Sequence, residues 1–169
     1  MLAPEKWSGT TIANVPIGQG IAASPLQLAA AYAAVANDGQ LVQPHLVRDS
    51  SQPWTRRVVS STVAAELRDM LTVTVEDGTG KLAQVHGYVV AGKTGTAQKV
   101  KTDGSGYAED RYIASFVGMV PADAPRLVIL VMVDEPANQH LGAYVAAPAF
   151  AKIADFSLKC LGIGPSTAD

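Results

Sequence analysis

Residues 87–98 read Gly-Tyr-Val-Val-Ala-Gly-Lys-Thr-Gly-Thr-Ala-Gln, and their conformation decides which fold the chain can have. The letters match G-x-x-x-x-G-K-[ST], the pattern of a loop that cradles phosphates and begins a helix at its lysine. Bulky and β-branched residues at 88–90 resist that curled loop, and Gly95 between β-branched Thr94 and Thr96 disfavours a helix after Lys93. We therefore predict a strand over about residues 88–97. A phosphate-binding nucleotide hydrolase is the least favoured hypothesis.

Two further strands are predicted after this one, over residues 112–120 and 127–133. The connections, residues 101–106 and 121–125, are short and rich in Gly, Asp and Pro. Short turns between consecutive strands imply antiparallel neighbours. The predicted fold class is therefore α/β of the α+β type, an antiparallel sheet flanked by helices.

Three helices are predicted beside the sheet. Ser24, Pro25 and Gln27 form a capping box with proline at the first helical position, and Gly39 suits the end of that helix. A second helix is expected from residue 60 or 61 to about 78, and a third over about 147–161. The residues expected to face inward are Val63, Leu67, Met70 and Leu71 on the second helix and Phe150, Ile153, Ala154, Ser157 and Leu158 on the third.

Composition excludes several classes of protein. In 169 residues, 48% hydrophobic and 17% charged residues are enough for one packed domain, and a net charge of −2 argues against nucleic-acid binding. The three histidines are far apart in sequence, so we expect no metal site, and no cofactor is expected. The single cysteine, Cys160, is expected to be a small core residue. The longest aliphatic run, residues 127–133, is too short to span a membrane, and residues 1–6 lack the features of a signal peptide.

Lys93-Thr94-Gly95 on an exposed strand suits a peptide that ends in a carboxylate. Lys93 supplies a positive charge, and the Thr94 and Thr96 hydroxyls are candidate donors to the carboxylate. Gly95 has no side chain, so a substrate backbone can approach closely. An exposed strand edge can also pair with an extended peptide, and its amides can stabilise an oxyanion.

The segments around this motif resemble a known family in both content and order. They are Ile17-Gly-Gln-Gly-Ile21, Ser24-Pro-Leu-Gln-Leu-Ala29 with Tyr32 and Ala36-Asn-Asp-Gly39, Ala91-Gly-Lys-Thr-Gly-Thr-Ala-Gln98, Ser115-Phe-Val-Gly118, Pro121-Ala-Asp123, Asp134-Glu-Pro136 and Ala146-Ala-Pro-x-Phe150. Over about residues 8–160 the chain is similar to the penicillin-binding transpeptidases. The resemblance is greatest to the monofunctional, class B peptidoglycan D,D-transpeptidases.

The resemblance implies roles for the four residues of the motif. Lys93 and Thr94 would bind the carboxylate of a stem peptide ending in D-Ala-D-Ala, or of a β-lactam. Thr96 would give a backbone N–H to the oxyanion hole and contact the substrate with its hydroxyl, and Gly95 would keep the strand approachable. For the parent protein the resemblance implies membrane anchoring and a place on the extracytoplasmic face of the bacterial cytoplasmic membrane.

The nucleophile of this family is absent from the chain. A serine hydroxyl needs a neighbouring base, which the family supplies in an S-x-x-K motif, with S-x-N beside it. No lysine here has a serine three residues before it, and the T-x-x-K formed by Thr96 and Lys99 overlaps the predicted strand. We therefore assign no catalytic residue to this chain. Residues 1–162 are predicted to be the C-terminal part of a transpeptidase domain, and residues 163–169 a flexible tail.

Two hypotheses follow from the missing motifs. The chain may be one piece of a split, clipped or truncated enzyme, whose N-terminal part lies on the same or another polypeptide. Alternatively it is a non-catalytic remnant or interaction module of the same fold. In either case the isolated chain should not be acylated, and it should expose apolar surface.

Overall fold

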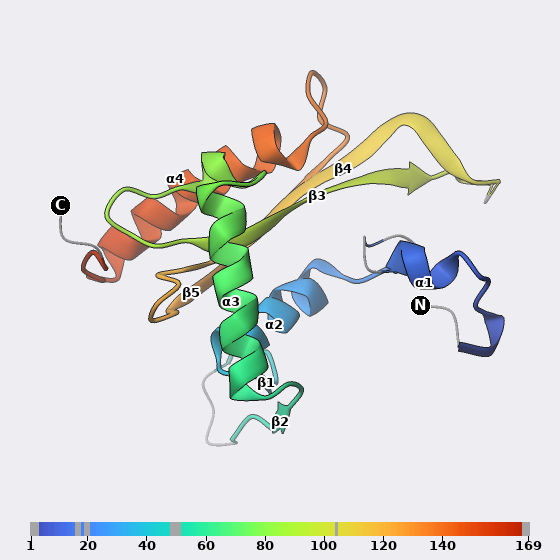
Figure 1. Cartoon of the computed structure of the whole chain (residues 1–169). Helices are drawn as coiled ribbons and strands as arrows, with labels where there is room; N and C mark the ends of the chain where they lie inside the picture. Colours follow the sequence, from blue (N-terminus) through green and yellow to red (C-terminus); the bar gives the residue numbers. More distant parts are fainter. Residues whose placement is uncertain (1–3, 16–17, 19–20, 48–51, 104, 167–169) are drawn as a thin grey trace.

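A three-stranded antiparallel sheet forms the centre of the molecule (Figure 1). The computed structural model describes residues 4–15, 18, 21–47, 52–103 and 105–166. The strands are β3 (Ala91–Val100), β4 (Tyr107–Val120) and β5 (Leu127–Asp134), in the order β3-β4-β5. The antiparallel sheet expected from the short connections is thus confirmed.

The first strand begins later than predicted. Residues 88–90 precede β3, because Gly87 has φ +79° and the Tyr88 N–H donates to the Val85 carbonyl at 3.1 Å, closing a turn. The Tyr88 hydroxyl donates to the Ile163 carbonyl at 2.6 Å, so this side chain is hydrogen-bonded to the C-terminal segment. The strand does run through Lys93, as predicted, and no helix begins at that residue.

Three main helices flank the sheet: α2 (Pro25–Ala36), α3 (Ser61–Glu76) and α4 (Gly142–Cys160). The smaller elements are η1 (Pro4–Lys6), α1 (Thr11–Asn14), η3 (Lys81–Ala83) and a separate two-stranded sheet of β1 (Gln40–Val42) and β2 (Thr55–Arg57). Of the expected Gly-Gln-Gly segment, residues 17, 19 and 20 lie outside the described residues.

The predicted helix signals are confirmed at α2 and α3. Ser24 Oγ accepts from the Gln27 N–H at 3.2 Å while Gln27 Oε1 accepts from the Ser24 N–H at 2.8 Å, which completes the capping box. Gly39 follows α2 with φ +83°, a conformation that favours glycine. Ser60 Oγ accepts from the Val63 N–H at 3.2 Å and fixes the start of α3.

The two faces of the sheet are covered by different helices. On one face Phe116 and Val120 of β4 pack against Phe150 and Ala154 of α4, and the two phenylalanine rings lie 4.8 Å apart at 59°. On the other face Met119 packs, with Ala91 and Ala122, against residues of α2 and α3, namely Tyr32, Val35, Ala36 and Leu71. The core is therefore divided by the sheet into an α4 side and an α2 side.

The last helix is longer than predicted. It begins at Gly142, five residues before the expected start at about residue 147, and holds Pro148 in its interior. Its start depends on a hydrogen bond to a side chain of β3, which is described below. The local sequence does not reveal this bond.

Several residues expected in the core are exposed. Val63 is 41%, Met70 65% and Ile153 45% exposed, and Cys160 is exposed as well. Val63 and Met70 lie on α3, whose inner side packs on α2 and the sheet. The apolar face predicted for α3 is thus wider than the part of this helix that packs against other described residues. Within the described ranges, no helix has the length and apolar character needed to cross a membrane.

The segment after α4 returns to the chain before β3. The Ser166 N–H donates to the Gly87 carbonyl at 2.9 Å, and Ser166 Oγ accepts from the Val89 N–H at 3.1 Å. Ile163 packs against the core. Residues 163–166 are therefore bonded to the body of the molecule, and residues 167–169 lie outside the described ones.

Replacement of Phe150 by alanine should strongly destabilise the fold. Phe150 is fully buried against Phe116, and removal of a buried phenylalanine ring costs about 3–5 kcal/mol. Phe156→Ala on the same helix is the matched control, because Phe156 is 69% exposed. Urea unfolding followed by circular dichroism should show a large loss of stability for Phe150→Ala only. Equal losses for both variants would contradict this packing.

Candidate functional site

The four residues of the predicted binding motif lie together on the outer strand of the described sheet. β3 pairs with β4 on one side, and the other side of β3 has no strand partner in the described part of the chain. Lys93 and Thr96 are exposed, and Thr94 and Gly95 are half-buried. The site is thus a strand edge with charged and hydroxyl side chains that solvent can reach.

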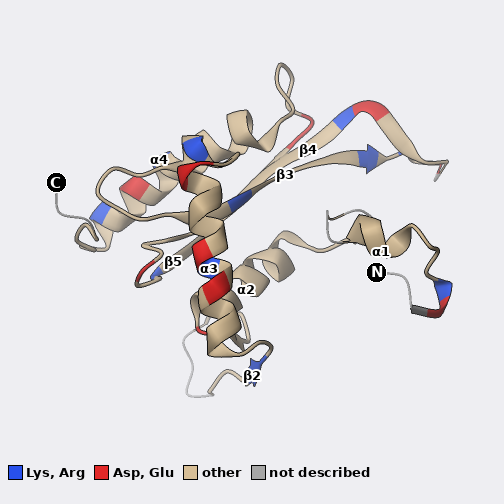
Figure 2. Ribbon diagram, in the orientation of Figure 1, with Lys and Arg blue, Asp and Glu red and all other residues tan. Residues whose placement is uncertain are grey.

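The ammonium group of Lys93 is not neutralised by the protein around it. Its Nζ donates to the Thr94 carbonyl at 3.2 Å, and within the described ranges it forms no ion pair with a carboxylate. Most other charged residues are distributed along the helices and strand ends (Figure 2). The positive charge on β3 is therefore available to an anionic ligand.

The hydroxyl of Thr94 is paired with a hydroxyl from a distant part of the chain. Thr94 Oγ1 lies 2.8 Å from Thr79 Oγ1, and either oxygen could donate. Thr79 lies in the turn that follows α3. No sequence pattern predicts this pair, since the contact depends on how the end of α3 crosses β3.

The hydroxyl of Thr96 completes the start of α4. Thr96 Oγ1 accepts from the Gly142 N–H at 3.1 Å, and Leu141, the N-cap residue of α4, provides no side-chain cap. The first N–H groups of a helix lack partners inside the helix. The Thr96 hydroxyl of β3 thus supplies a partner for the N–H of the first helical residue, and this bond explains why α4 begins at Gly142.

A side chain in place of Gly95 would contact β4. A Cβ at this position would lie 2.5 Å from Ser115 Oγ on β4. A Cβ at Gly142 would lie 2.3 Å from the Ser115 carbonyl oxygen and 2.4 Å from that of Gly95. The start of α4 is therefore pressed directly onto the backbones of β3 and β4, next to the predicted site.

A salt-bridge network ties the far end of β3 to the end of β5. Lys99 Nζ donates to Asp134 Oδ1 and Oδ2 at 2.9 and 3.1 Å and to Glu135 Oε1 at 2.7 Å. These hydrogen bonds, to Glu135 first and then to Asp134, raise the pKa of Lys99. Asp134 and Glu135 thus both bond Lys99 at the end of β5.

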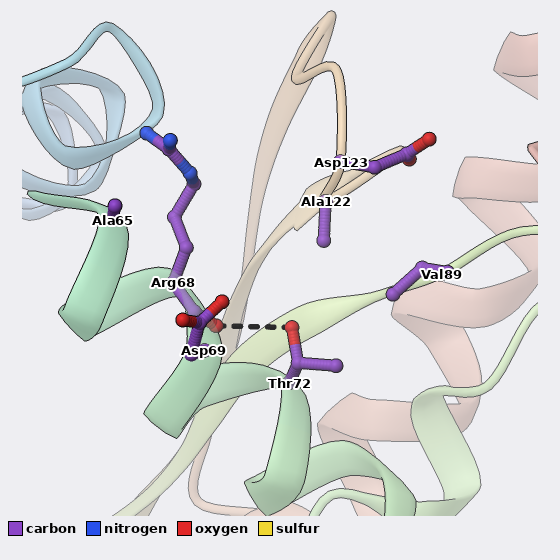
Figure 3. A pocket seen from close by; sticks show the side chains of 7 residues that line it. All are labelled: Ala65, Arg68, Asp69, Thr72, Val89, Ala122 and Asp123. Carbon is purple, nitrogen blue, oxygen red and sulfur yellow. Dashed lines mark hydrogen bonds between the residues drawn. The ribbon is translucent and has the colours of Figure 1, made fainter.

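A hollow of about 270 Å³ between α3 and the turn after β4 is a poor alternative site (Figure 3). Asp69 and Asp123 lie in its lining and would repel a carboxylate. Its one cation, Arg68, already donates through Nη1 to the Val35 carbonyl and to Asp38 Oδ1, both at 3.0 Å. In the described part of the chain, His, Cys, Asp and Glu form no group suited to a metal ion.

The chain belongs to the penicillin binding protein transpeptidase domain family, whose model matches residues 2–155. It is 44% identical over 163 residues to the probable peptidoglycan D,D-transpeptidase PbpC of Pseudomonas aeruginosa, covering 95% of this chain and 28% of that protein. It is 40% identical over 174 residues to the penicillin-binding protein PbpB of Mycobacterium tuberculosis, covering 92% of this chain and 26% of PbpB. The chain thus spans about a quarter of the length of these relatives.

Solved structures agree with this assignment. The penicillin binding protein 3 of Mycobacterium tuberculosis, complexed with ampicillin, superposes with a TM-score of 0.90 at 37% identity, covering 99% of this chain and 41% of that one. The transpeptidase domain of Burkholderia pseudomallei penicillin-binding protein 3 gives 0.87 at 40% identity, covering 99% and 52%. The predicted family and fold class are both confirmed.

Replacement of Lys99 by methionine should destabilise the protein in a pH-dependent way. Because the folded-state pKa of Lys99 is raised, its contribution is complete below the ordinary lysine pKa of about 10.4 and is lost as the pH rises through the folded value. Thermal unfolding of wild type and Lys99→Met should therefore differ at pH 8 and converge as the pH rises through the raised folded-state pKa of Lys99. Lys101→Met, which removes an exposed lysine nearby, is the control. A difference that stays constant with pH would contradict the network.

Proposed function

We propose that this chain supplies the substrate-binding strand of a serine-type peptidoglycan D,D-transpeptidase. The observation that carries the proposal is the exposed edge of β3, where an ammonium group without a carboxylate partner among the described residues and two threonine hydroxyls lie within four consecutive residues, 93–96. The names of the relatives favour the same activity.

The substrate group recognised by this strand would be a carboxylate. Lys93 offers a positive charge, and Thr94 and Thr96 offer hydroxyl hydrogens, which are the groups that a carboxylate accepts from. A stem peptide ending in D-Ala-D-Ala and a β-lactam both carry such a carboxylate. The structural neighbour from Mycobacterium tuberculosis was solved with ampicillin, a β-lactam, which supports this ligand class.

The backbone of β3 would hold the reacting carbonyl. Lys93 Nζ bonds the Thr94 carbonyl, which indicates that this carbonyl points to the free side of the strand. Backbone groups of an antiparallel strand alternate between its two sides, so the Thr96 N–H belongs to the free side as well. There it could donate to the oxyanion of a tetrahedral intermediate.

The nucleophile would come from a part of the domain that bears the S-x-x-K and S-x-N motifs, here called the motif-bearing part. Its serine oxygen would attack the carbonyl carbon of the penultimate D-Ala while the activating base takes the hydroxyl proton. The bond to the terminal D-Ala would break, and the departing amine would take up a proton. An amine of a neighbouring stem would then attack the acyl-serine ester, form the cross-link and release the serine.

A groove between α2 and α3 is the proposed contact surface for the motif-bearing part. It has a volume of about 300 Å³ and is lined by Ala31, Tyr32, Val35, Leu67, Met70, Leu71 and Thr74. α2 contains no charged residue (Figure 2). Burial raises the pKa of Tyr32, as expected for a phenol in apolar surroundings. The match leaves 59% of one solved relative's chain and 48% of the other's unmatched, which is enough chain to provide a partner for this groove.

The location proposed for the whole protein is the extracytoplasmic side of the cytoplasmic membrane, where peptidoglycan is cross-linked. A membrane anchor would belong to the parent protein. The alternative function, a non-catalytic remnant or interaction module of this fold, has the same surfaces but would never take part in acylation.

Incubation with a reporter penicillin should acylate only the assembled domain. The chain alone should show no covalent adduct by intact-mass analysis, because it has no S-x-x-K motif. Addition of the motif-bearing part, on the same or a second polypeptide, should give one adduct, located on that part. Lys93→Ala should slow acylation by about tenfold or more, since a charged hydrogen bond to the ligand is lost. Absence of an adduct in the assembled wild type would favour the non-catalytic alternative.

Replacement of Met70 by glutamate should weaken assembly. Met70 lines the groove and is 65% exposed in this chain, so burial against a partner would leave the new carboxylate desolvated and unpaired. Leu161→Glu is the matched control, because Leu161 is 61% exposed and lies after α4. Sedimentation velocity should show at least about tenfold weaker complex formation for Met70→Glu only. Equal complex formation by both variants would remove the groove from the interface.

A further inference from the structure

The hydroxyl of Thr79 contacts Thr94 of the proposed carboxylate site and has no role in the function described so far. Its Oγ1 is 2.8 Å from Thr94 Oγ1, and in the described part of the chain it makes no other hydrogen bond. Both residues are open enough for a ligand to alter the direction of this bond, since Thr79 is exposed and Thr94 half-buried.

The direction of this hydrogen bond determines what Thr94 can offer a ligand. A threonine hydroxyl has one hydrogen and two lone pairs. If Thr94 donates to Thr79, it has no hydrogen left for a carboxylate, which can only accept. If Thr79 donates to Thr94, the Thr94 hydrogen is free to bond the ligand. We propose that Thr79 is a positioning residue, which donates to Thr94 Oγ1 and thereby directs the Thr94 hydrogen to the substrate carboxylate. The inference rests on the proposed function.

The backbone around Thr79 is held in place by the end of α3. The Gly80 N–H donates to the Thr74 carbonyl at 2.9 Å, and the Gly78 N–H donates to the Val73 carbonyl at 3.2 Å. A Cβ at Gly78 would lie 2.7 Å from the Thr74 carbonyl oxygen, so the turn lies directly against the helix. Thr79 therefore projects from a fixed support, as orientation of another side chain requires.

The second hydroxyl of the site is arranged in the same way. Thr96 Oγ1 accepts from the Gly142 N–H at 3.1 Å, and a backbone N–H can only donate. The direction of that bond is therefore fixed, and the Thr96 hydrogen is free for a ligand. With Thr79 as donor to Thr94, both threonines of the strand would accept one hydrogen bond from the protein and donate one to the carboxylate.

The test compares acylation of the assembled domain by a penicillin and by its carboxylate ester. Thr79→Val should slow acylation by the free acid by about five- to tenfold, because Thr94 loses its orienting donor. It should leave acylation by the ester almost unchanged, since the ester has no carboxylate to orient. Thr79→Ser keeps the hydroxyl and should restore the wild-type rate. Thr72→Val is the control, because Thr72 Oγ1 donates to the Arg68 carbonyl of its own helix and Thr72 does not line the groove between α2 and α3.

Two results would overturn the inference. A wild-type rate for Thr79→Val with the free acid would show that Thr94 needs no donor, and equal slowing with acid and ester would indicate a purely structural role for Thr79. Thr79→Ala repeats the test with a smaller side chain if the valine variant does not fold. Failure of the proposed function looks different, since the wild-type assembly would then not be acylated or would not depend on Lys93.

Discussion

The close approach of α4 to the sheet is the constraint on which the rest of the structure depends. At Gly142 a Cβ would lie within 2.3–2.4 Å of two carbonyl oxygens, from Ser115 of β4 and Gly95 of β3, so the helix can begin only where a glycine stands. From that point α4 runs over the sheet and buries Phe150 against β4. The same contact places the first N–H of α4 on Thr96. Packing of the core and orientation of the site thus have a common origin.

The resulting site lies along the edge of a single strand. β3 presents an ammonium group and two hydroxyls along an edge, and each hydroxyl has a hydrogen-bond partner behind it, Gly142 for Thr96 and Thr79 for Thr94. The apolar groove between α2 and α3 is not covered by other described residues. An oriented polar site together with an uncovered apolar groove agrees with the proposal that a motif-bearing part completes the domain.

Local sequence predicted the elements whose signals are local and failed where distant segments meet. The capping box of Ser24 and Gln27 needs only neighbouring residues, and it was predicted correctly. The strand through the Lys-Thr-Gly motif followed from steric preferences, although its first residues turned out to be a turn. The exposed position of Met70 could not be predicted, because helical spacing shows which face is apolar but not whether a partner covers it. The contacts of Thr79 and Gly142 with β3 depend on tertiary packing, which sets the start of α4 as well.

The most direct test of the central claim is a crystal structure of the chain assembled with the motif-bearing part and acylated by a penicillin. The account predicts that the penicillin carboxylate lies within about 3 Å of the Thr94 and Thr96 hydroxyl oxygens and close to Lys93, with the acyl carbonyl oxygen at the Thr96 N–H. A carboxylate bound away from β3, or an acyl group that makes no contact with the edge of this strand, would contradict it.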